Sequence, residues 1–173
     1  MSTPNLLTDT ITSPIGDIVI VAAEGKLLAL EFADVGERMA ADLAFRFGDY
    51  DLEPRRNPFS IGERLRAYFR GDIAALDAIE VDTGGTPFQR RVWQALRRIP
   101  PGTTRTYSEL ARAAGRPQAI RAAGAANGRN PVSIVVLCHR AIGKDGSLTG
   151  YGGGVERKRW LLRHEGARVA ALV

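Results

Sequence analysis

The chain has 173 residues, of which 45% are hydrophobic and 25% are charged, a composition typical of folded globular proteins rather than disordered ones. No segment reaches the ~18 apolar residues that cross a membrane, and the first residues lack the basic stretch and apolar core of a secretory signal. One cysteine can form neither an internal disulfide nor a thiolate metal cluster, so we expect a cytoplasmic protein with a free thiol and no membrane partner.

The charge is divided unevenly along the chain. Residues 1–83 carry eight Lys and Arg against fifteen Asp and Glu, a net charge of −7, whereas residues 84–173 carry sixteen against four, a net charge of +12. A short segment at +12 indicates a polyanionic partner, most often nucleic acid, although a solvated basic face is the simpler alternative. We therefore predict two domains, an acidic one at 1–83 and a basic, nucleic-acid-binding one at 84–173.

Residues 1–83 have the pattern of a small α+β domain. Apolar runs at 18–21 and 27–30 predict strands joined by a turn at Glu24-Gly25-Lys26, and residues 79–81 predict another short strand. Apolar residues four apart predict two helices, the second ending near Gly71: Met39, Leu43 and Phe47, then Ile61, Leu65 and Phe69. This half contains neither His nor Cys, so we find no catalytic constellation in it.

Residues 84–173 predict a mainly helical domain. Thr86-Pro87 opens a helix as N-cap and first residue, and Pro100-Pro101-Gly102 ends it. Thr106 and Glu109 have capping-box spacing for the next helix, which Gly115 terminates. A third helix is predicted to start at Pro117 and to run to about 127–128, so the last two form a helix-turn-helix candidate.

The helix predicted after Pro117 is almost bare of side chains. Alanine and glycine predominate in it, and Arg121 stands alone among them. Small residues allow close packing between helices, but they equally allow a helix backbone to approach DNA with one long cation reaching in. The residues alone leave these two interpretations even.

The single cysteine, Cys138, follows the apolar run 134–137 and precedes His139. A free thiol has a pKa near 8.5, so a reactive cysteine needs a base or a favourable field. His139 and His164 are the candidate bases, but in a regular strand the side chain of His139 would point away from Cys138. Of the four acids in this half, Glu165 is our first choice to orient an imidazole. The alternative is a small buried residue at the end of a strand.

An ordered series of motifs helps to decide whether Cys138 is a reactive nucleophile or a small buried residue. It comprises Thr86-Pro87-Phe88-Gln89, Val92-Trp93-Gln94-Ala95-Leu96, Ile99-Pro100-Pro101-Gly102, Thr106-Tyr107, Arg121-Ala122, Asn130-Pro131, Cys138-His139-Arg140 and Gly150-Tyr151. The series resembles the O6-alkylguanine-DNA alkyltransferases from about Thr86 to Glu165, roughly half of the chain. The resemblance implies an α+β fold: a ribonuclease H-like mixed sheet/helix domain followed by a mostly helical winged helix-turn-helix domain.

The resemblance also implies a reaction: irreversible, single-turnover transfer of the alkyl group of O6-alkylguanine, and of O4-alkylthymine, from duplex DNA to a cysteine, with base flipping. Cys138 would be the acceptor, and His139 its base through a water molecule. Glu165 would orient His139, Tyr107 would donate a hydrogen bond at guanine N3, and Asn130 would brace the turn. No metal or other cofactor is implied, and we expect a monomer.

The same resemblance assigns the residues that would hold DNA and the flipped base. Arg121 would fill the gap that the flipped nucleotide leaves. The other residues expected at the DNA are Ala119, Ala122, Gly124, Tyr107 and Arg140. The residues expected to wall the base pocket are Tyr151, Gly152, Gly153 and Val136.

One departure from the family pattern leaves other functions open. The family usually has proline immediately before its cysteine, whereas this chain has Leu137, which adds a backbone N–H and frees φ. If Leu137 disabled the thiol, the chain would be a lesion-binding protein without chemistry, like the alkyltransferase-like proteins. A cysteine hydrolase or a simple helix-turn-helix regulator finds less support, since neither a hydrolase signature nor base-reading side chains are evident.

Overall fold

The computed structural model describes residues 2–148 and 150–172 and divides them into two compact units. Unit 1 contains the described residues up to Gly84 together with Pro131–Ser133, and unit 2 contains the described remainder. The short segment 131–133 joins unit 1 because its backbone pairs with residue Leu30: the Leu30 N–H donates to the Pro131 carbonyl at 3.0 Å, and the Ser133 N–H donates to the Leu30 carbonyl at 3.1 Å. No helix among the described residues is long and apolar enough to cross a membrane.

Unit 1 is built on a mixed four-stranded sheet with the order β3-β2-β1-β4. The strands are β1 (Asn5–Ile11), β2 (Ile18–Ala23), β3 (Lys26–Phe32) and β4 (Asp51–Pro54). β2 pairs antiparallel with both neighbours, and β4 pairs parallel with β1. The predicted turn joins β2 to β3, and Glu24 and Gly25 both have positive φ, as tight hairpins of this kind require.

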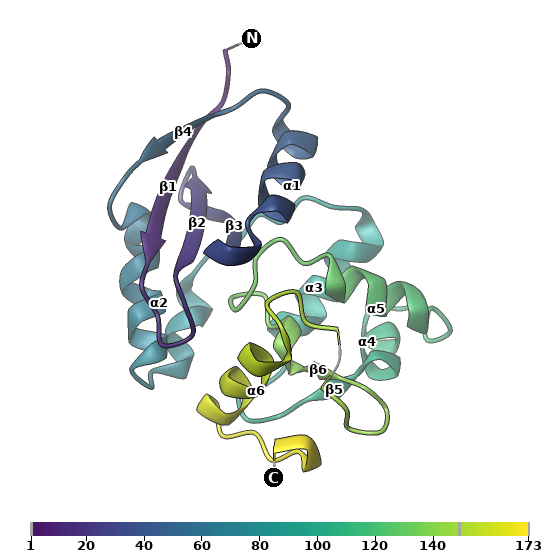
Figure 1. Cartoon of the computed structure of the whole chain (residues 1–173). Helices are drawn as coiled ribbons and strands as arrows, with labels where there is room; N and C mark the ends of the chain where they lie inside the picture. The colour runs from purple at the N-terminus through teal and green to yellow at the C-terminus, as the bar shows by residue number, and fades with distance from the viewer. Residues whose placement is uncertain (1, 149, 173) are drawn as a thin grey trace. The chain divides into compact units, whose positions relative to one another are not determined.

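Two helices cover this sheet, α1 (Glu37–Phe47) and α2 (Ile61–Phe69), and Figure 1 shows them on either side of it. β3 is buried at every position after Lys26, which is the pattern of a strand covered on both faces. Leu43 of α1 packs with a cluster of sheet residues: Leu6, Val21, Leu28 and Ala29. The predicted hairpin and both predicted helices are therefore confirmed.

Some details of unit 1 differ from the sequence prediction. β1 and β4 were not predicted, because Asn5–Ile11 is largely polar and β4 is exposed at the edge of the sheet. The strand expected at 79–81 is reduced to a single bridge between Val81 and Leu27. In α2 the fully buried aromatic residue is Tyr68 rather than Phe69, because Tyr68 follows Leu65 by three residues on the inner face.

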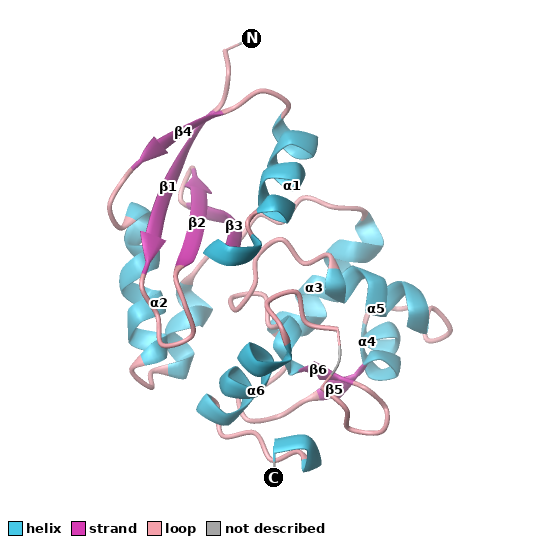
Figure 2. Ribbon diagram, viewed as in Figure 1, coloured by secondary structure: helices cyan, strands magenta, loops and turns pink. Residues whose placement is uncertain are grey.

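Unit 2 contains four helices and a small parallel sheet, coloured by type in Figure 2. The helices are α3 (Pro87–Arg97), α4 (Tyr107–Ala113), α5 (Ile120–Gly128) and α6 (Val155–His164), and the strands are β5 (Arg105–Thr106) and β6 (Ala141–Ile142). Both predicted N-caps form complete capping boxes, Thr86 with Gln89 and Thr106 with Glu109. The α+β architecture, with a mixed sheet domain before a helical one, is the predicted fold class.

The start of α5 corrects one prediction. Pro117 was expected to open this helix, but Arg116–Ala119 forms a turn and the helix begins at Ile120. α5 packs against α3, and the indole N–H of Trp93 donates to the carbonyl of Ala126 at 2.8 Å. The same indole lies so close to Gly85 that an added Cβ there would stand 2.5 Å from the ring, so a glycine is required at that position.

Candidate active site

The segment before Cys138 turns instead of forming a strand. Ile134 has a φ of +72°, which is unfavourable for a β-branched side chain, and no regular strand follows among the described residues up to Leu137. Cys138–Arg140 then forms a single turn of 3-10 helix. The chain therefore turns at Cys138, so the objection that a regular strand would point the side chain of His139 away from Cys138 does not apply.

Hydrogen bonds to one carbonyl brace this turn. The backbone N–H of Cys138 donates to the carbonyl of Val136 at 2.8 Å. The side-chain amide of Asn130, which is 1% exposed, donates to the same oxygen at 2.8 Å. Asn130, Val136 and Cys138 are thus brought together, and Val136 contributes its backbone oxygen to the turn while its own side chain is buried.

A buried network of charges lies directly behind Cys138. Nε2 of His139 contacts Oε1 of Glu165, the residue that caps the C-terminus of α6. Arg140 donates from Nε to Oε2 of the same carboxylate at 2.6 Å and from Nη1 to the Ile99 carbonyl. All three side chains are at most 3% exposed. Glu165 is therefore held from both sides by cationic or polar partners in a region without access to water.

The network sets the ionisation of Glu165. Burial by itself would raise the pKa of this carboxyl, but the charges and hydrogen bonds of His139 and Arg140 outweigh it and lower the pKa to about 2. With Glu165 engaging Nε2, the other imidazole nitrogen, Nδ1, is buried and has no hydrogen-bond partner among the described residues. Because Nε2 faces the Glu165 carboxylate, Nε2 carries the hydrogen of the neutral imidazole, and Nδ1 is the nitrogen that can accept a proton.

Lys158 is a functional candidate that was not predicted. Its side chain is fully buried in α6, and Nζ donates to the Ala141 carbonyl at 2.5 Å. Burial lowers the pKa of Lys158 to about 8, while the negative charge of Cys138 opposes part of that shift. A sequence signal existed, because residues 158, 161, 162 and 165 have the spacing of one helix face, but lysine is a residue type normally found in solvent.

Tyr107 lies close to two glycines, Gly124 of α5 and Gly150. It is the first residue of α4 and is half-buried. A Cβ added at Gly124 would be 3.9 Å from its ring, and one added at Gly150 would be 3.5 Å from its hydroxyl, so both positions lie next to Tyr107. Burial first and the charge of Cys138 second raise the pKa of Tyr107. The phenol therefore stays protonated at neutral pH and can act as a hydrogen-bond donor.

α5 divides its small residues between two faces. Ala123 and Ala126 are buried, whereas Arg121, Ala122 and Ala125 are exposed. The buried alanines fit close packing between helices, and the exposed face remains the one predicted to approach DNA. Ala119 and Gly124, also predicted to lie at DNA, are half-buried.

Arg140 requires a correction. It was predicted to contact DNA, but its side chain is 3% exposed and is bonded to Glu165 and to the Ile99 carbonyl. A guanidinium in this position has no free surface for a phosphate, so its role is to hold Glu165. Among the predicted pocket residues, Tyr151 is buried, Gly152 is exposed and Gly153 is half-buried.

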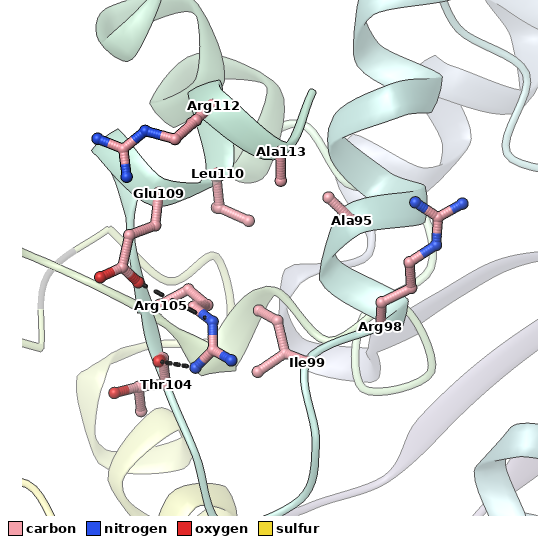
Figure 3. A pocket seen from close by; sticks show the side chains of 9 residues that line it. All are labelled: Ala95, Arg98, Ile99, Thr104, Arg105, Glu109, Leu110, Arg112 and Ala113. Carbon is pink, nitrogen blue, oxygen red and sulfur yellow. Dashed lines mark hydrogen bonds and ion pairs between the residues drawn. The ribbon is translucent and has the colours of Figure 1, made fainter. Parts of the chain in front are cut away.

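A separate hollow of about 550 Å³ lies between the end of α3 and α4 (Figure 3). Within this hollow, Nη1 of Arg105 donates to the Thr104 carbonyl at 2.9 Å. Nε of Arg105 lies 4.0 Å from Oε2 of Glu109. Its lining contains none of the residues predicted for the site: Ala95, Arg98, Ile99, Thr104, Arg105, Glu109, Leu110, Arg112 and Ala113. Within the described part of the chain, no group of three or more His, Cys, Asp or Glu side chains could hold a metal ion.

Known proteins resemble the chain in both sequence and structure. Residues 87–167 match the family described as 6-O-methylguanine DNA methyltransferase, DNA binding domain. The methylated-DNA–protein-cysteine methyltransferase of Salmonella typhimurium is 50% identical over 164 residues, which covers 93% of this chain and 96% of the relative. The protein of the same name from Mycolicibacterium paratuberculosis is 44% identical and covers 90% of each chain.

Solved structures extend the similarity to the fold. The crystal structure of Mycobacterium tuberculosis O6-methylguanine methyltransferase matches with a TM-score of 0.74 at 41% identity, over 93% of both chains. Mycobacterium tuberculosis OGT in complex with DNA also matches with a TM-score of 0.74, at 42% identity, over 94% of this chain and 92% of that one. These matches include unit 1 as well as the segment with the sequence motifs.

Proposed function

The chain belongs to the methylated-DNA–protein-cysteine methyltransferase family, and from that premise we propose how its own residues carry out the reaction. It is an enzyme of direct DNA repair that moves an alkyl group from DNA to a cysteine of the protein. The proposed acceptor is Cys138, and the proposed substrate is double-stranded DNA containing O6-alkylguanine, with O4-alkylthymine as a second lesion. The target base is flipped out of the duplex to reach the thiol.

The observation that supports Cys138 as the acceptor is that its backbone is held in a hydrogen-bonded turn and that the next residue is a buried histidine in contact with a carboxylate. Cys138 is the only cysteine in the chain, and the Val136 carbonyl and Asn130 amide restrain its backbone. The next residue, His139, is fully buried against Glu165. An imidazole held by a carboxylate is the usual means of activating a nucleophile, and a structural cysteine has no need of one.

The proposed step balances without a further reactant. His139 takes the thiol proton through a water molecule, and the resulting Sγ attacks the alkyl carbon. The new S–C bond forms as the C–O6 bond breaks, and the electron pair passes into the guanine ring system. Tyr107, kept neutral by its raised pKa, donates a hydrogen bond at N3 as that charge develops. The thioether is stable, so each molecule reacts once.

DNA binding is proposed for the exposed face of α5. Arg121 is exposed there with the small residues Ala122 and Ala125 after it, so the helix backbone can approach a groove while the guanidinium replaces the flipped base. The net charge of +12 over residues 84–173 supplies phosphate attraction. Because every group of the proposed step comes from one chain, we propose a monomer, working in the reducing cytoplasm that keeps the thiol free.

The direct test is the stoichiometry of transfer with the substrate in molar excess over the protein. A duplex with O6-methylguanine labelled in the methyl group should transfer one methyl group per protein molecule, and the reaction should then stop. The Cys138→Ser variant should bind the same duplex and transfer none. Continued turnover, or equal transfer by Cys138→Ser, would contradict the proposal.

Leu137 supports one alternative, a protein that binds the lesion without reacting. The retained cysteine and its buried His139–Glu165 pair argue for chemistry. If wild type bound the lesion but transferred nothing, and Leu137→Pro switched transfer on, the alternative would hold.

A further inference from the structure

Residues 131–133 belong to unit 1, although the chain on both sides of them belongs to unit 2. They follow Asn130, which braces the acceptor turn, and they end directly before Ile134, whose φ is +72°. A β-branched residue in that conformation is strained, so surrounding contacts must hold it there. The segment that leads into Ile134 is therefore placed to control how Cys138 is presented.

The outer edge of β3 holds this segment by its backbone. Leu30 donates to the Pro131 carbonyl and accepts from the Ser133 N–H. Val132 faces Leu30 in a parallel bridge. Because backbone hydrogen bonds are the same for every residue, the register of a paired strand depends on its side chains. A slip along β3 would carry Ile134 away from its position, so a side-chain contact is needed to fix the register.

Glu31, the neighbour of Leu30 in β3, makes such a contact. Its carboxylate is buried, and Oε1 accepts a long hydrogen bond of 3.5 Å from the hydroxyl of Ser133, which is buried as well. The same oxygen accepts from the Phe32 N–H at 3.2 Å, and Oε2 lies 3.5 Å from Nη2 of Arg38. A slip of the segment would move the hydroxyl away from the carboxylate, so this pair favours one register.

A carboxylate is a costly side chain for this position. A buried charge loses its hydration, and an apolar residue of similar size often stabilises a fold equally well or better. The residues on either side of Glu31 in β3 are apolar and buried, so packing alone would favour another apolar residue. Fixing a register is the best-attested use of a buried polar group, and the contact with Ser133 gives Glu31 that use.

We propose that Glu31 is a positioning residue of the acceptor turn and that it acts through Ser133; this rests on the function proposed above. By fixing residues 131–133 on β3, the pair keeps Ile134 at positive φ and Cys138 in its turn. Because Glu31 acts on the turn and not on DNA, its loss should slow methyl transfer without weakening duplex binding.

The experiment separates the rate of transfer from the affinity for DNA. Glu31→Leu, Ser133→Ala and the double variant are reacted with a duplex containing O6-methylguanine and with the free base O6-benzylguanine, and duplex affinity is measured separately. Each single variant should react about tenfold slower with both substrates, the size of one buried hydrogen bond, at wild-type affinity. The double variant should be no slower than the slower single variant, because the two residues act as a pair.

Two further variants distinguish this role from general support of the fold. Glu31→Gln keeps an oxygen that can accept from Ser133, so it should retain most of the wild-type rate. Glu80 is exposed, and its carbonyl accepts from Leu27 on the same edge of β3, but it does not precede the acceptor turn. Glu80→Leu is therefore the matched control and should react at the wild-type rate.

Hydrogen exchange supplies a structural readout. In Glu31→Leu, the amides from Ser133 to Cys138 should exchange faster than in wild type, whereas those of β1 should exchange at the wild-type rate. A residue that only supported the sheet would speed exchange in β1 as well. Thermal unfolding identifies any variant that does not fold, and if Glu31→Leu does not, Ser133→Ala, the smaller change, decides by the same measurements.

The outcomes separate this inference from the proposed function. A wild type that transfers no methyl group from O6-methylguanine overturns both. If wild type reacts, a folded Glu31→Leu with the wild-type rate overturns the inference alone. So do an equal loss in Glu31→Gln or Glu80→Leu, additive losses in the double variant, a loss confined to duplex affinity, or faster exchange throughout the sheet.

Discussion

Two regions of unit 2 use cationic residues in opposite ways. Behind Cys138, Arg140 and Lys158 are buried, and each is tied to a specific oxygen. On α5, Arg121 is exposed, as are Ile120 before it and Ala122 and Ala125 after it. Buried charges shift pKa values and are costly to leave unpaired, whereas an exposed charge acts through phosphate attraction and reach. Chemistry and DNA binding should therefore respond to different mutations.

The largest effect is expected from Glu165→Gln, which would break the buried network. Glutamine keeps the shape but leaves Arg140 buried without its counter-charge, so we expect a loss of about 3–5 kcal/mol in the free energy of unfolding and slower methyl transfer. Urea unfolding and single-turnover kinetics measure the two effects. Glu156→Gln, at an exposed carboxylate of the same helix, is the matched control and should be nearly neutral.

The comparison of wild type with Glu165→Gln also gives a pH test. Because the pKa of Glu165 falls from 4.5 to about 2 on folding, its contribution to stability is complete above about pH 5. It decreases as the pH falls and is gone below about pH 2. The stability difference between wild type and Glu165→Gln should shrink over that range. A difference that stayed constant down to pH 2 would show that the charge of Glu165 is not what stabilises the network.

Lys158→Met tests the second buried cation. The pKa of Lys158 falls from 10.5 to about 8 on folding, so the unfolded chain binds more protons between these values. Wild-type stability should therefore gain up to about 3 kcal/mol from this residue as the pH rises from 8 to 10.5. Unfolding measured against pH should show that gain in wild type and not in Lys158→Met. Identical dependence of stability on pH in wild type and Lys158→Met would show that the pKa of Lys158 does not change on folding.

Arg121→Ala tests the exposed region. We expect methyl transfer from duplex DNA to fall by about tenfold to a hundredfold, the size of one important DNA contact, while the reaction with the free base O6-benzylguanine stays at the wild-type rate. Protein stability should not change. Arg98→Ala, an exposed arginine at the end of α3, is the control and should affect both substrates little. Equal losses on duplex and free base would place Arg121 in the chemistry instead.

The smallest effect is expected from Leu137→Pro. Leu137 has a φ of −81°, close to the range that proline imposes. Proline should therefore raise the free energy of unfolding by up to about 1 kcal/mol by restricting the unfolded chain and leave the transfer rate unchanged. A clear loss of stability would show that the Leu137 N–H has a partner that proline removes.

The sequence predicted much of this organisation where local rules decide it. The N-cap at Thr86, the capping box at Thr106 and the hairpin at Glu24–Gly25 depend on neighbouring residues and were predicted correctly. The acceptor segment was not: Ile134–Leu137 has the composition of a strand, but tertiary contacts hold it in turns with Ile134 at positive φ. Composition cannot show such a conformation, because only packing elsewhere compensates for its strain.

The site residues likewise divide into those that the sequence could identify and those whose role depends on contacts with distant segments. Cys138, His139 and Glu165 could be grouped through the resemblance and through the scarcity of His and acids in this half. Arg140 was predicted at the DNA and Lys158 was not singled out at all, since a cation is normally placed in solvent. Their burial depends on oxygens from distant segments, the Glu165 carboxylate and the Ala141 carbonyl, which no local pattern in the sequence indicates.

The most direct test of the central claim is peptide mass spectrometry after reaction with a duplex containing O6-methylguanine. The account predicts that the peptide with Cys138 gains the mass of one CH₂ group, at one per molecule, and that fragmentation places it on sulfur. Cys138→Ser should gain nothing. An unmodified Cys138 peptide after the DNA has lost its methyl group, or a methyl group on any other residue, would contradict it.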